Sequence, residues 1–203
     1  TFAEALQDFS GACKRVLQVS GLEQFPLFVK PNHLGSSIGV GVADGESTLQ
    51  RRLAQIFQLD DEALVETCVL NPLEINVSVL EGTPPRASVF EIPVASNQVL
   101  TFEDKYMRGG SKSGGSQGMA SLTRVIDPED LPQKMKEKVT DYALRTYKLF
   151  RCRGVVRFDF IVDPKTNRLY FNEVNPIPGS LSFYLWQGCR PKMLYPELLN
   201  HLV

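Results

Sequence analysis

The sequence has little of what marks a nucleic-acid-binding, membrane or disulfide-stabilised protein. Its formal net charge is −1 over 203 residues, so no global basic field favours nucleic acid as a partner. The hydrophobic runs are short and are broken by charged residues or proline, so no membrane span is expected. The four cysteines lack CxxC spacing, and we expect reduced thiols in a cytoplasmic protein.

Histidine is also scarce, and the chain shows no signal-peptide pattern. His33 lies in a turn and His201 near the C-terminus, and neither is assigned a role because neither has partners at metal-ligand spacing. The first residues, "TFAEALQDFSGACKRV", have apolar positions at helical spacing and predict one amphipathic helix that ends at Gly21. With 43% hydrophobic residues, the chain is long enough to bury a core.

The order of the predicted elements indicates an α+β protein. Strands are expected at 26–30, 38–42, 63–68, 73–82, 87–94, 155–162 and 169–174, and the alternation in 73–82 predicts a half-buried strand. A capping box at Ser47 and Gln50 predicts a helix whose apolar stripe contains Leu49, Leu53, Ile56 and Phe57. Asp127-Pro128-Glu129 predicts the start of a long helix, with a buried face formed by Leu131, Met135, Val139, Tyr142, Tyr147 and Phe150.

A break at Asn71-Pro72 predicts two lobes, a small one over 1–70 and a large one over 71–203. Within the small lobe, the segment "FVKPNHLGSSIGV" places Lys30 ahead of a glycine- and serine-rich turn. Backbone N–H groups of such a turn, with the hydroxyls of Ser36 and Ser37, can bind an anion, and Lys30 can neutralise phosphate charge. The alternative is a hairpin turn that uses glycine for positive φ, with Lys30 simply solvated.

The two late strands contain the most informative polar residues. Alternation places Arg157 and Asp159 on one face of the first strand, and Glu173 and Asn175 on one face of the second. If these strands form a hairpin, two carboxylates and an amide oxygen converge, and such hard ligands suit Mg²⁺. The alternative is an ion pair between Arg157 and a nearby carboxylate, with Asn175 as a turn residue.

Lys105 precedes residues 108–118, "RGGSKSGGSQG", whose composition predicts a mobile loop. A lid over phosphates would hinge at this position. The alternative is an ordinary exposed lysine.

These segments in this order resemble the ATP-grasp fold, and more narrowly the D-alanine–D-alanine ligase family. The matching stretches are "FPLFVKPNHLGSSIGV", "ALVETCVLNPLEINVSVL", "FEDKY", "CRGVVRFDF" and "LYFNEVNPIPGSLSFY". The resemblance implies that two lobes clasp ATP and that a substrate carboxylate attacks the γ-phosphate. An amine then takes the acylphosphate to give a dipeptide, ADP and phosphate, as in peptidoglycan precursor synthesis in the cytoplasm.

The resemblance also implies a role for each matching residue. The α- and β-phosphates would contact Lys30 and Lys105, adenine would contact Glu66 with the backbone of Cys68 and Val69, and the ribose would contact Glu74. Two Mg²⁺ ions, or Mn²⁺ in their place, would bind Asp159, Glu173 and Asn175. The acyl centre would face Arg157 and the backbone of Gly179, and the attacking amine would face Ser36 and Tyr106.

Three departures from the family pattern qualify these roles. Glu66 and Glu74 stand one residue further apart than usual, which places an insertion at Asn71-Pro72. Tyr184 stands about where many members have a serine that binds the acceptor's carboxylate, so either Ser182 substitutes or the acceptor differs from D-alanine. Third, no stretch of this sequence resembles the amino-terminal α/β domain with which full-length ligases begin. We therefore expect the ATP-binding part of a larger ligase, inactive alone and a candidate homodimer in full-length form.

Three functions remain open at this point. The first is a ligase of D-alanine with D-alanine, and the second is a ligase of the same fold with another amino acid or a hydroxy acid as acceptor. The third is a nucleotide-binding module without turnover.

Overall fold

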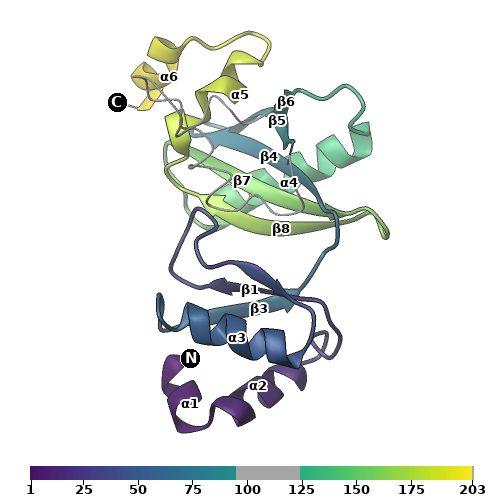
Figure 1. Ribbon diagram of the computed structural model, residues 1–203. Helices are drawn as coiled ribbons and strands as arrows, with labels where there is room; N and C mark the ends of the chain where they lie inside the picture. The colour runs from purple at the N-terminus through teal and green to yellow at the C-terminus, as the bar shows by residue number, and fades with distance from the viewer. Residues whose placement is uncertain (95–123, 203) are drawn as a thin grey trace, which may run out of the picture. The chain divides into compact units, whose positions relative to one another are not determined.

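The structure is a computed structural model of the 203-residue chain, and it describes residues 1–94 and 124–202. The chain divides into two compact units, and the division falls between Leu70 and Asn71. The described part of the first unit is 1–70, and that of the second is 71–94 with 124–202. Each unit combines helices with an antiparallel sheet, which confirms the predicted α+β class (Figure 1).

The first unit is a three-stranded sheet covered by helices on one face. Its sheet has the order β2-β1-β3, from Gly41–Ala43, Leu27–Pro31 and Ala63–Thr67. The helices are α1 (Phe2–Gln7), α2 (Phe9–Leu17) and α3 (Glu46–Ile56). The core between sheet and helices consists of Cys13, Leu27, Val29, Ala43, Leu49, Leu53 and Ile56.

Two helix boundaries in this unit differ from the prediction. The single helix predicted from residue 2 is wrong, because the backbone leaves the helical region at Asp8 (φ −155°). The side chain of Asp8 instead accepts a hydrogen bond from the N–H of Gly11 (2.9 Å) and begins α2, as Asp commonly does at an N-cap. The capping box is also wrong: Gly45 is the N-cap of α3, so Ser47 and Gln50 lie inside the helix.

The second unit is a five-stranded antiparallel sheet of order β6-β5-β4-β7-β8. Its strands are β4 (Leu73–Leu80), β5 (Arg86–Pro93), β6 (Arg124–Ile126), β7 (Val155–Asp163) and β8 (Arg168–Asn175). Helix α4 (Gln133–Leu149) covers one face. The opposite face is covered in part by η2 (Gly179–Ser182), α5 (Phe183–Gln187) and α6 (Tyr195–Leu202) (Figure 1).

Strand β4 is more deeply buried than its alternation suggested. Ile75 and Val77 pack under α4, but the polar residues Asn76 and Ser78 of the other face are buried as well. The indole Nε1 of Trp186, on α5, donates a hydrogen bond to the Ser78 hydroxyl (3.3 Å). The half-buried strand is therefore a wrong prediction for this part of β4, because α5 covers the face expected to meet solvent.

Helix α4 begins six residues later than Asp127. Pro132 is its N-cap, and a proline disfavours helical backbone in the preceding residue, which here is Leu131. Met135, Val139 and Tyr147 are buried as predicted, whereas Phe150 lies beyond the helix and is 52% exposed.

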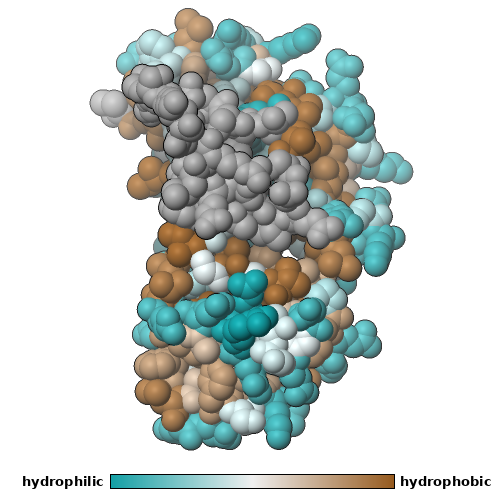
Figure 2. Space-filling model, viewed as in Figure 1, coloured by the Kyte–Doolittle hydropathy of each residue, from teal (hydrophilic) through white to brown (hydrophobic). Residues whose placement is uncertain are grey.

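The surface is mixed in character, as the small net charge suggests. In the view of Figure 2, hydrophobic and hydrophilic residues are interspersed in both units. Among the described helices, none is long and apolar enough to cross a membrane. The four cysteines are free in the structure.

The contrast between two phenylalanines tests where the core of the second unit lies. Phe158 is fully buried and Phe150 is half-exposed. We expect Phe158→Ala to lower the free energy of unfolding by about 3–5 kcal/mol, since it leaves a cavity under α4. Phe150→Ala should cost about 1 kcal/mol or less. Denaturant unfolding followed by fluorescence reports on this unit, because Trp186 is the single tryptophan of the chain. Equal losses for the two variants would contradict the assignment.

Candidate functional site

The hairpin of β7 and β8 brings the predicted metal-site residues together. Asp159 lies directly opposite Glu173, and Arg157 directly opposite Asn175. Residues directly opposite in an antiparallel pair project from the same face of the sheet. That face is the one opposite α4, since the intervening Phe158 packs into the core under α4.

One extra residue in β8 allows this arrangement. Phe160 is opposite Phe171 and Asp159 is opposite Glu173, so Asn172 has no partner in the register and forms a β-bulge. Strict alternation would put Glu173 on the side of Phe171, whose ring contacts that of Phe160 on the α4 side (centroids 5.7 Å apart). The bulge shifts the alternation by one residue and turns Glu173 and Asn175 toward Asp159. The sequence analysis did not predict it.

The four side chains form one connected group. The Arg157 guanidinium donates from Nε to Asp159 Oδ1 (2.7 Å) and from Nη2 to Oδ2 (2.8 Å). The amide nitrogen of Asn175 donates to Asp159 Oδ2 (2.9 Å) and to Glu173 Oε1 (3.4 Å). The predicted convergence is thus present. The ion pair considered as its alternative exists too, inside the same group, and Asn175 belongs to β8 rather than to a turn.

Burial and charge act in opposite directions on Arg157. Burial lowers its pKa, whereas the hydrogen bonds and the negative charge of Asp159 raise it, and the net result is a pKa above the ordinary arginine value. The guanidinium therefore stays positive at every pH at which the protein is folded. A fixed positive charge beside two carboxylates can stabilise an anion that develops during a reaction.

The polar row extends beyond the predicted residues. Asn76 on β4 is opposite Asp159 on one side and Glu91 of β5 on the other. Both are buried, with exposures of 6% and 5%, and the Asn76 amide nitrogen donates to Glu91 Oε2 (3.2 Å). Within the described ranges, Asn76 Oδ1 is buried and has no hydrogen-bond partner. The sequence analysis missed both residues, although a glutamate inside the apolar stretch "SVFEIPV" is a detectable signal.

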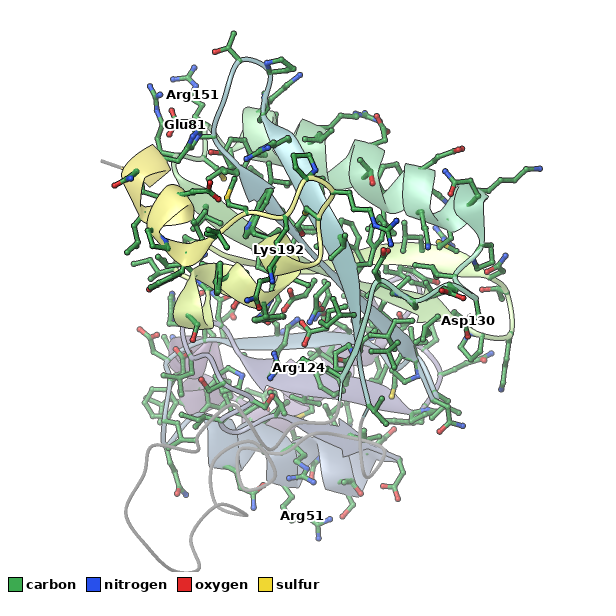
Figure 3. The ribbon with its side chains drawn as sticks, turned by 90° about the horizontal axis from the view of Figure 1, so that it is seen from above. Arg51, Glu81, Arg124, Asp130, Arg151 and Lys192 are labelled. Atoms are coloured by element: carbon green, nitrogen blue, oxygen red, sulfur yellow. The ribbon has the colours of Figure 1, made fainter. Side chains whose placement is uncertain are left out.

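Tyr184 is bound into the end of this row. Its hydroxyl donates to Glu91 Oε2 (2.8 Å), and the guanidinium of Arg124, labelled in Figure 3, stacks on its ring at 4.5 Å. Arg124 also pairs with Glu91 (3.4 Å). Burial and the nearby Glu91 charge raise the pKa of Tyr184 to about 12, so its hydroxyl remains protonated. The Ser182 hydroxyl is buried and has no partner among the described residues.

Gly179 lies at the start of η2, just after β8. The next three residues, Ser180, Leu181 and Ser182, all have φ near +50°. L-amino acids adopt this left-handed conformation at a cost, and such strain is concentrated at functional sites.

The first unit contains the lysine and glutamate predicted to meet the nucleotide. Lys30 on β1 and Glu66 on β3 form an ion pair of 2.9 Å. Both project from the face opposite the helices, because their neighbours Leu27, Val29 and Val65 pack into the helix-covered core. Lys30 is therefore paired rather than simply solvated.

Three other nucleotide candidates are close in sequence to the boundary between Leu70 and Asn71. Cys68 and Val69 follow β3, and the N–H of Cys68 donates to the carbonyl of Pro26 (3.2 Å). Glu74 is exposed on β4, on the same face as Asn76. Lys105 and Tyr106 lie outside the described residues, as does the segment 108–118.

The glycine- and serine-rich turn uses left-handed backbone at its serines. Ser36 (φ 57°), Ser37 (φ 61°) and Gly39 (φ 73°) all lie in that region, and Gly35 does not. The N–H of Ile38 closes the turn on the carbonyl of Gly35 (3.1 Å). The alternative of a hairpin turn expected glycine at the positions of positive φ. Of the three residues that have positive φ here, only Gly39 is a glycine.

His33 anchors the beginning of this turn, a role that the sequence did not reveal. Its backbone N–H and its Nδ1 both contact the carboxylate of Asp60, at 2.7 and 2.9 Å. Asp61 and Glu62 lie at 3.7 and 3.9 Å from the ring nitrogens. The hydrogen bond that the ring donates to Asp60, and the negative charge of that carboxylate, raise the pKa of His33. The partners are 27 residues apart, so no local spacing indicates them.

The fold class follows from a comparison with solved structures. The solved structure of D-alanyl-alanine synthetase A from Vibrio cholerae superposes with a TM-score of 0.68 at 25% identity, covering 95% of this chain and 52% of that one. The fold is accordingly ATP-grasp, as the resemblance of the sequence implied.

The family follows from the sequence comparison. The family described as D-ala D-ala ligase C-terminus matches residues 4–203, and the chain belongs to it. D-alanine–D-alanine ligases from Acetivibrio thermocellus and Chlorobaculum tepidum are each 32% identical, over 183 and 190 residues. These matches cover 88% and 93% of this chain but 45% and 49% of the relatives, so the chain spans about half their length.

The titration of His33 tests the anchor of the turn. We expect an NMR pKa above the value of about 6.5 usual for histidine, because protonation strengthens the contact with Asp60. Asp60→Asn should return the pKa toward 6.5, and Asp61→Asn, whose carboxylate is more distant, should change it less. The protonated form is the one that the fold favours. Its contribution to stability is therefore complete below pH 6.5 and is lost as the pH rises through the higher folded-state value. An unchanged pKa in Asp60→Asn would contradict the contact.

Proposed function

We propose that the protein containing this chain is an ATP-dependent ligase that joins two amino acids of the D-alanyl-D-alanine type for peptidoglycan precursor synthesis in the cytoplasm. The observation that carries the proposal is the convergence of Asp159, Glu173 and Asn175 beside Arg157, in a chain that belongs to the ligase family. Family membership supports this reaction type, and the cluster offers charges that such a reaction needs.

The donor set suits a divalent cation. The side-chain amide of Asn175 lies within hydrogen-bonding distance of both the Asp159 and the Glu173 carboxylates, and oxygen ligands of this kind are those that Mg²⁺ and Mn²⁺ prefer. We propose that Asp159, Glu173 and Asn175 hold two such ions. When bound, the ions would neutralise the charge of the ATP phosphates and of the phosphoryl group in transfer.

The remaining residues position the reactants. A substrate carboxylate attacks the γ-phosphorus of ATP, ADP leaves, and an acylphosphate forms. The neutral amine of the second substrate then attacks the acyl carbon, and phosphate leaves with the bonding electron pair and takes up the proton that the nitrogen loses. Arg157 keeps its positive charge throughout and, with the N–H of Gly179, stabilises the oxyanion at the acyl carbon. Proximity and charge supply most of the rate enhancement in such chemistry.

We propose nucleotide and amine contacts for residues of both units. Lys30 and Lys105 contact the α- and β-phosphates, and the turn around Ser37 covers the phosphates with its N–H groups. Adenine is bound by Glu66 and by the backbone of Cys68 and Val69, and the ribose hydroxyls by Glu74. The attacking amine is oriented by Ser36 and Tyr106. The full-length enzyme is proposed to be a homodimer.

A second candidate is a ligase of this fold with a different acceptor. The observation that favours it is the hydroxyl pattern after Gly179. The Tyr184 hydroxyl is committed to the Glu91 carboxylate, and the Ser182 hydroxyl is buried. If the acceptor lies at this segment, the Tyr184 hydroxyl is not available to its carboxylate, and Ser182 would have to leave its buried position to substitute for the serine that the family uses. Phosphate release from ATP with D-alanine and with a panel of amino and hydroxy acids separates the two candidates.

Replacement of the metal ligands tests the first candidate. In the full-length protein, Asp159→Asn and Glu173→Gln should lower turnover about 100-fold or more, because each removes a charge that holds the metal and the phosphates. The melting temperature should change by only a few degrees. Asp163→Asn, at the end of the same strand, is the matched control. Asp163 binds Lys165 and Thr166 in the β7–β8 turn, and its replacement should leave turnover near wild type.

Different outcomes point to different functions. ATP-dependent release of phosphate with D-alanine, suppressed by the two ligand variants, supports the proposal. Wild-type turnover in either ligand variant would contradict the metal assignment. Nucleotide binding with no turnover on any acceptor would identify a binding module.

A further inference from the structure

The positively charged side chain of Arg157 is paired with Asp159, the carboxylate on which the proposed metal site depends. The guanidinium of Arg157 spans both oxygens of Asp159, at 2.7 and 2.8 Å. This two-pronged geometry is the strongest form of an arginine–carboxylate contact. The pair is largely buried, with side-chain exposures of 18% and 12%, so water screens it less than it would a surface pair.

Asn175 closes the same carboxylate from the other strand. Its amide nitrogen donates to Asp159 Oδ2 and also reaches Glu173 Oε1. Asp159 Oδ2 thus accepts two hydrogen bonds, which uses both of its lone pairs. A metal needs the oxygen of Asn175 rather than its nitrogen. A half turn of the amide about its terminal torsion presents that oxygen and removes the donor.

We propose that Arg157 and Asn175 form a latch on Asp159, and that a divalent cation binds there only as the arginine fork withdraws and the asparagine amide turns. The inference rests on the proposed function, since the metal site is the one proposed above. It predicts the direction of an effect that the proposed function alone does not give: Arg157 weakens metal binding, although it assists the reaction.

The charges of the group explain why Arg157 should weaken metal binding. With Arg157 in place, the formal charge of Arg157, Asp159 and Glu173 together is −1. Removal of the guanidinium increases the electrostatic repulsion between the Asp159 and Glu173 carboxylates, which lie opposite each other on neighbouring strands. A divalent cation would relieve that repulsion. A structural role for Arg157, in which it holds Asp159 in the orientation for metal binding, gives the opposite expectation.

The latch also links metal loading to the substrate. An arginine that leaves Asp159 is free to pair with another anion, such as a phosphate or the carboxylate undergoing activation. Because coupling between sites is reciprocal, an anion that captures Arg157 strengthens metal binding, and the metal makes Arg157 available to the anion. Arg157 then blocks the Asp159 carboxylate before the metal binds, and it acts as a catalytic residue once the metal is bound.

The test is Mn²⁺ binding to the nucleotide-free protein, followed by calorimetry and by the electron paramagnetic resonance of the free ion. We expect Arg157→Met to bind Mn²⁺ about tenfold or more tightly than wild type, as removal of a charge in contact with the site predicts. Arg145→Met is the matched control. Arg145 is exposed on α4 and pairs with Asp141, so its loss should leave Mn²⁺ affinity unchanged.

Two further variants make every outcome decisive. If Asp159→Asn does not weaken Mn²⁺ binding, the proposed metal site is wrong. If it does weaken binding, but Arg157→Met binds Mn²⁺ no more tightly than wild type, the metal site stands and the latch is overturned. Circular dichroism and Trp186 fluorescence check that each variant folds. Arg157→Gln keeps a hydrogen-bond donor without the charge, and it replaces Arg157→Met in the comparison should that variant fail to fold.

Discussion

The register between β7 and its two neighbours is the constraint on which the second unit depends. Together with the pairing of β4 and β5, it sets Glu91, Asn76, Asp159 and Glu173 in one row across four strands, although these residues are separated in the sequence by up to 97 positions. A shift of any strand by one residue would exchange the polar row for apolar side chains. The packing under α4 opposes such a shift, because the positions between the polar residues on the same strands hold apolar side chains that pack there. The core thereby fixes the position of the polar groups.

The polar face is stable because its buried groups are paired with one another. Glu91 accepts from Asn76 and Tyr184 and lies beside Arg124, so its negative charge is compensated inside the protein. Ser78 likewise links Trp186 to the sheet. Burial of an unpaired charge would cost several kcal/mol, whereas a hydrogen-bonded network avoids most of that cost. Polar groups can therefore lie close to a hydrophobic cluster around Trp186 without disrupting it.

The sequence was sufficient for most of the strands and for the faces on which the candidate metal ligands lie. Period-two alternation placed Arg157 and Asp159 on one face of one late strand, and Glu173 and Asn175 on one face of the other. These signals are local, so they can be read from spacing. The start of α4 was misjudged because two prolines compete for it, and the helix begins after Pro132 rather than at Pro128. Local preference alone does not decide between two such starts.

The contacts that spacing could not indicate are those between distant segments. His33 meets Asp60 across 27 residues, and Tyr184 meets Glu91 across 93. Neither pairing follows from a pattern in either segment, because it depends on how the elements pack. The burial of both faces of β4 has the same origin, since the cover on its second face comes from α5, more than 100 residues later. Sequence periodicity describes one element at a time, and these contacts involve two.

The bulge at Asn172 has a consequence for how this strand can vary. Its side chain is exposed and lies outside the pairing register, so many residues could stand at this position. Its presence as a spacer is what cannot change, because the residues on either side of it face opposite sides of the sheet. A deletion here would carry Glu173 into the core and leave Phe171 in place, whereas a substitution would leave both where they are. A residue must therefore be present at position 172, but its identity matters little. At the neighbouring positions it is the identity of the side chain that matters.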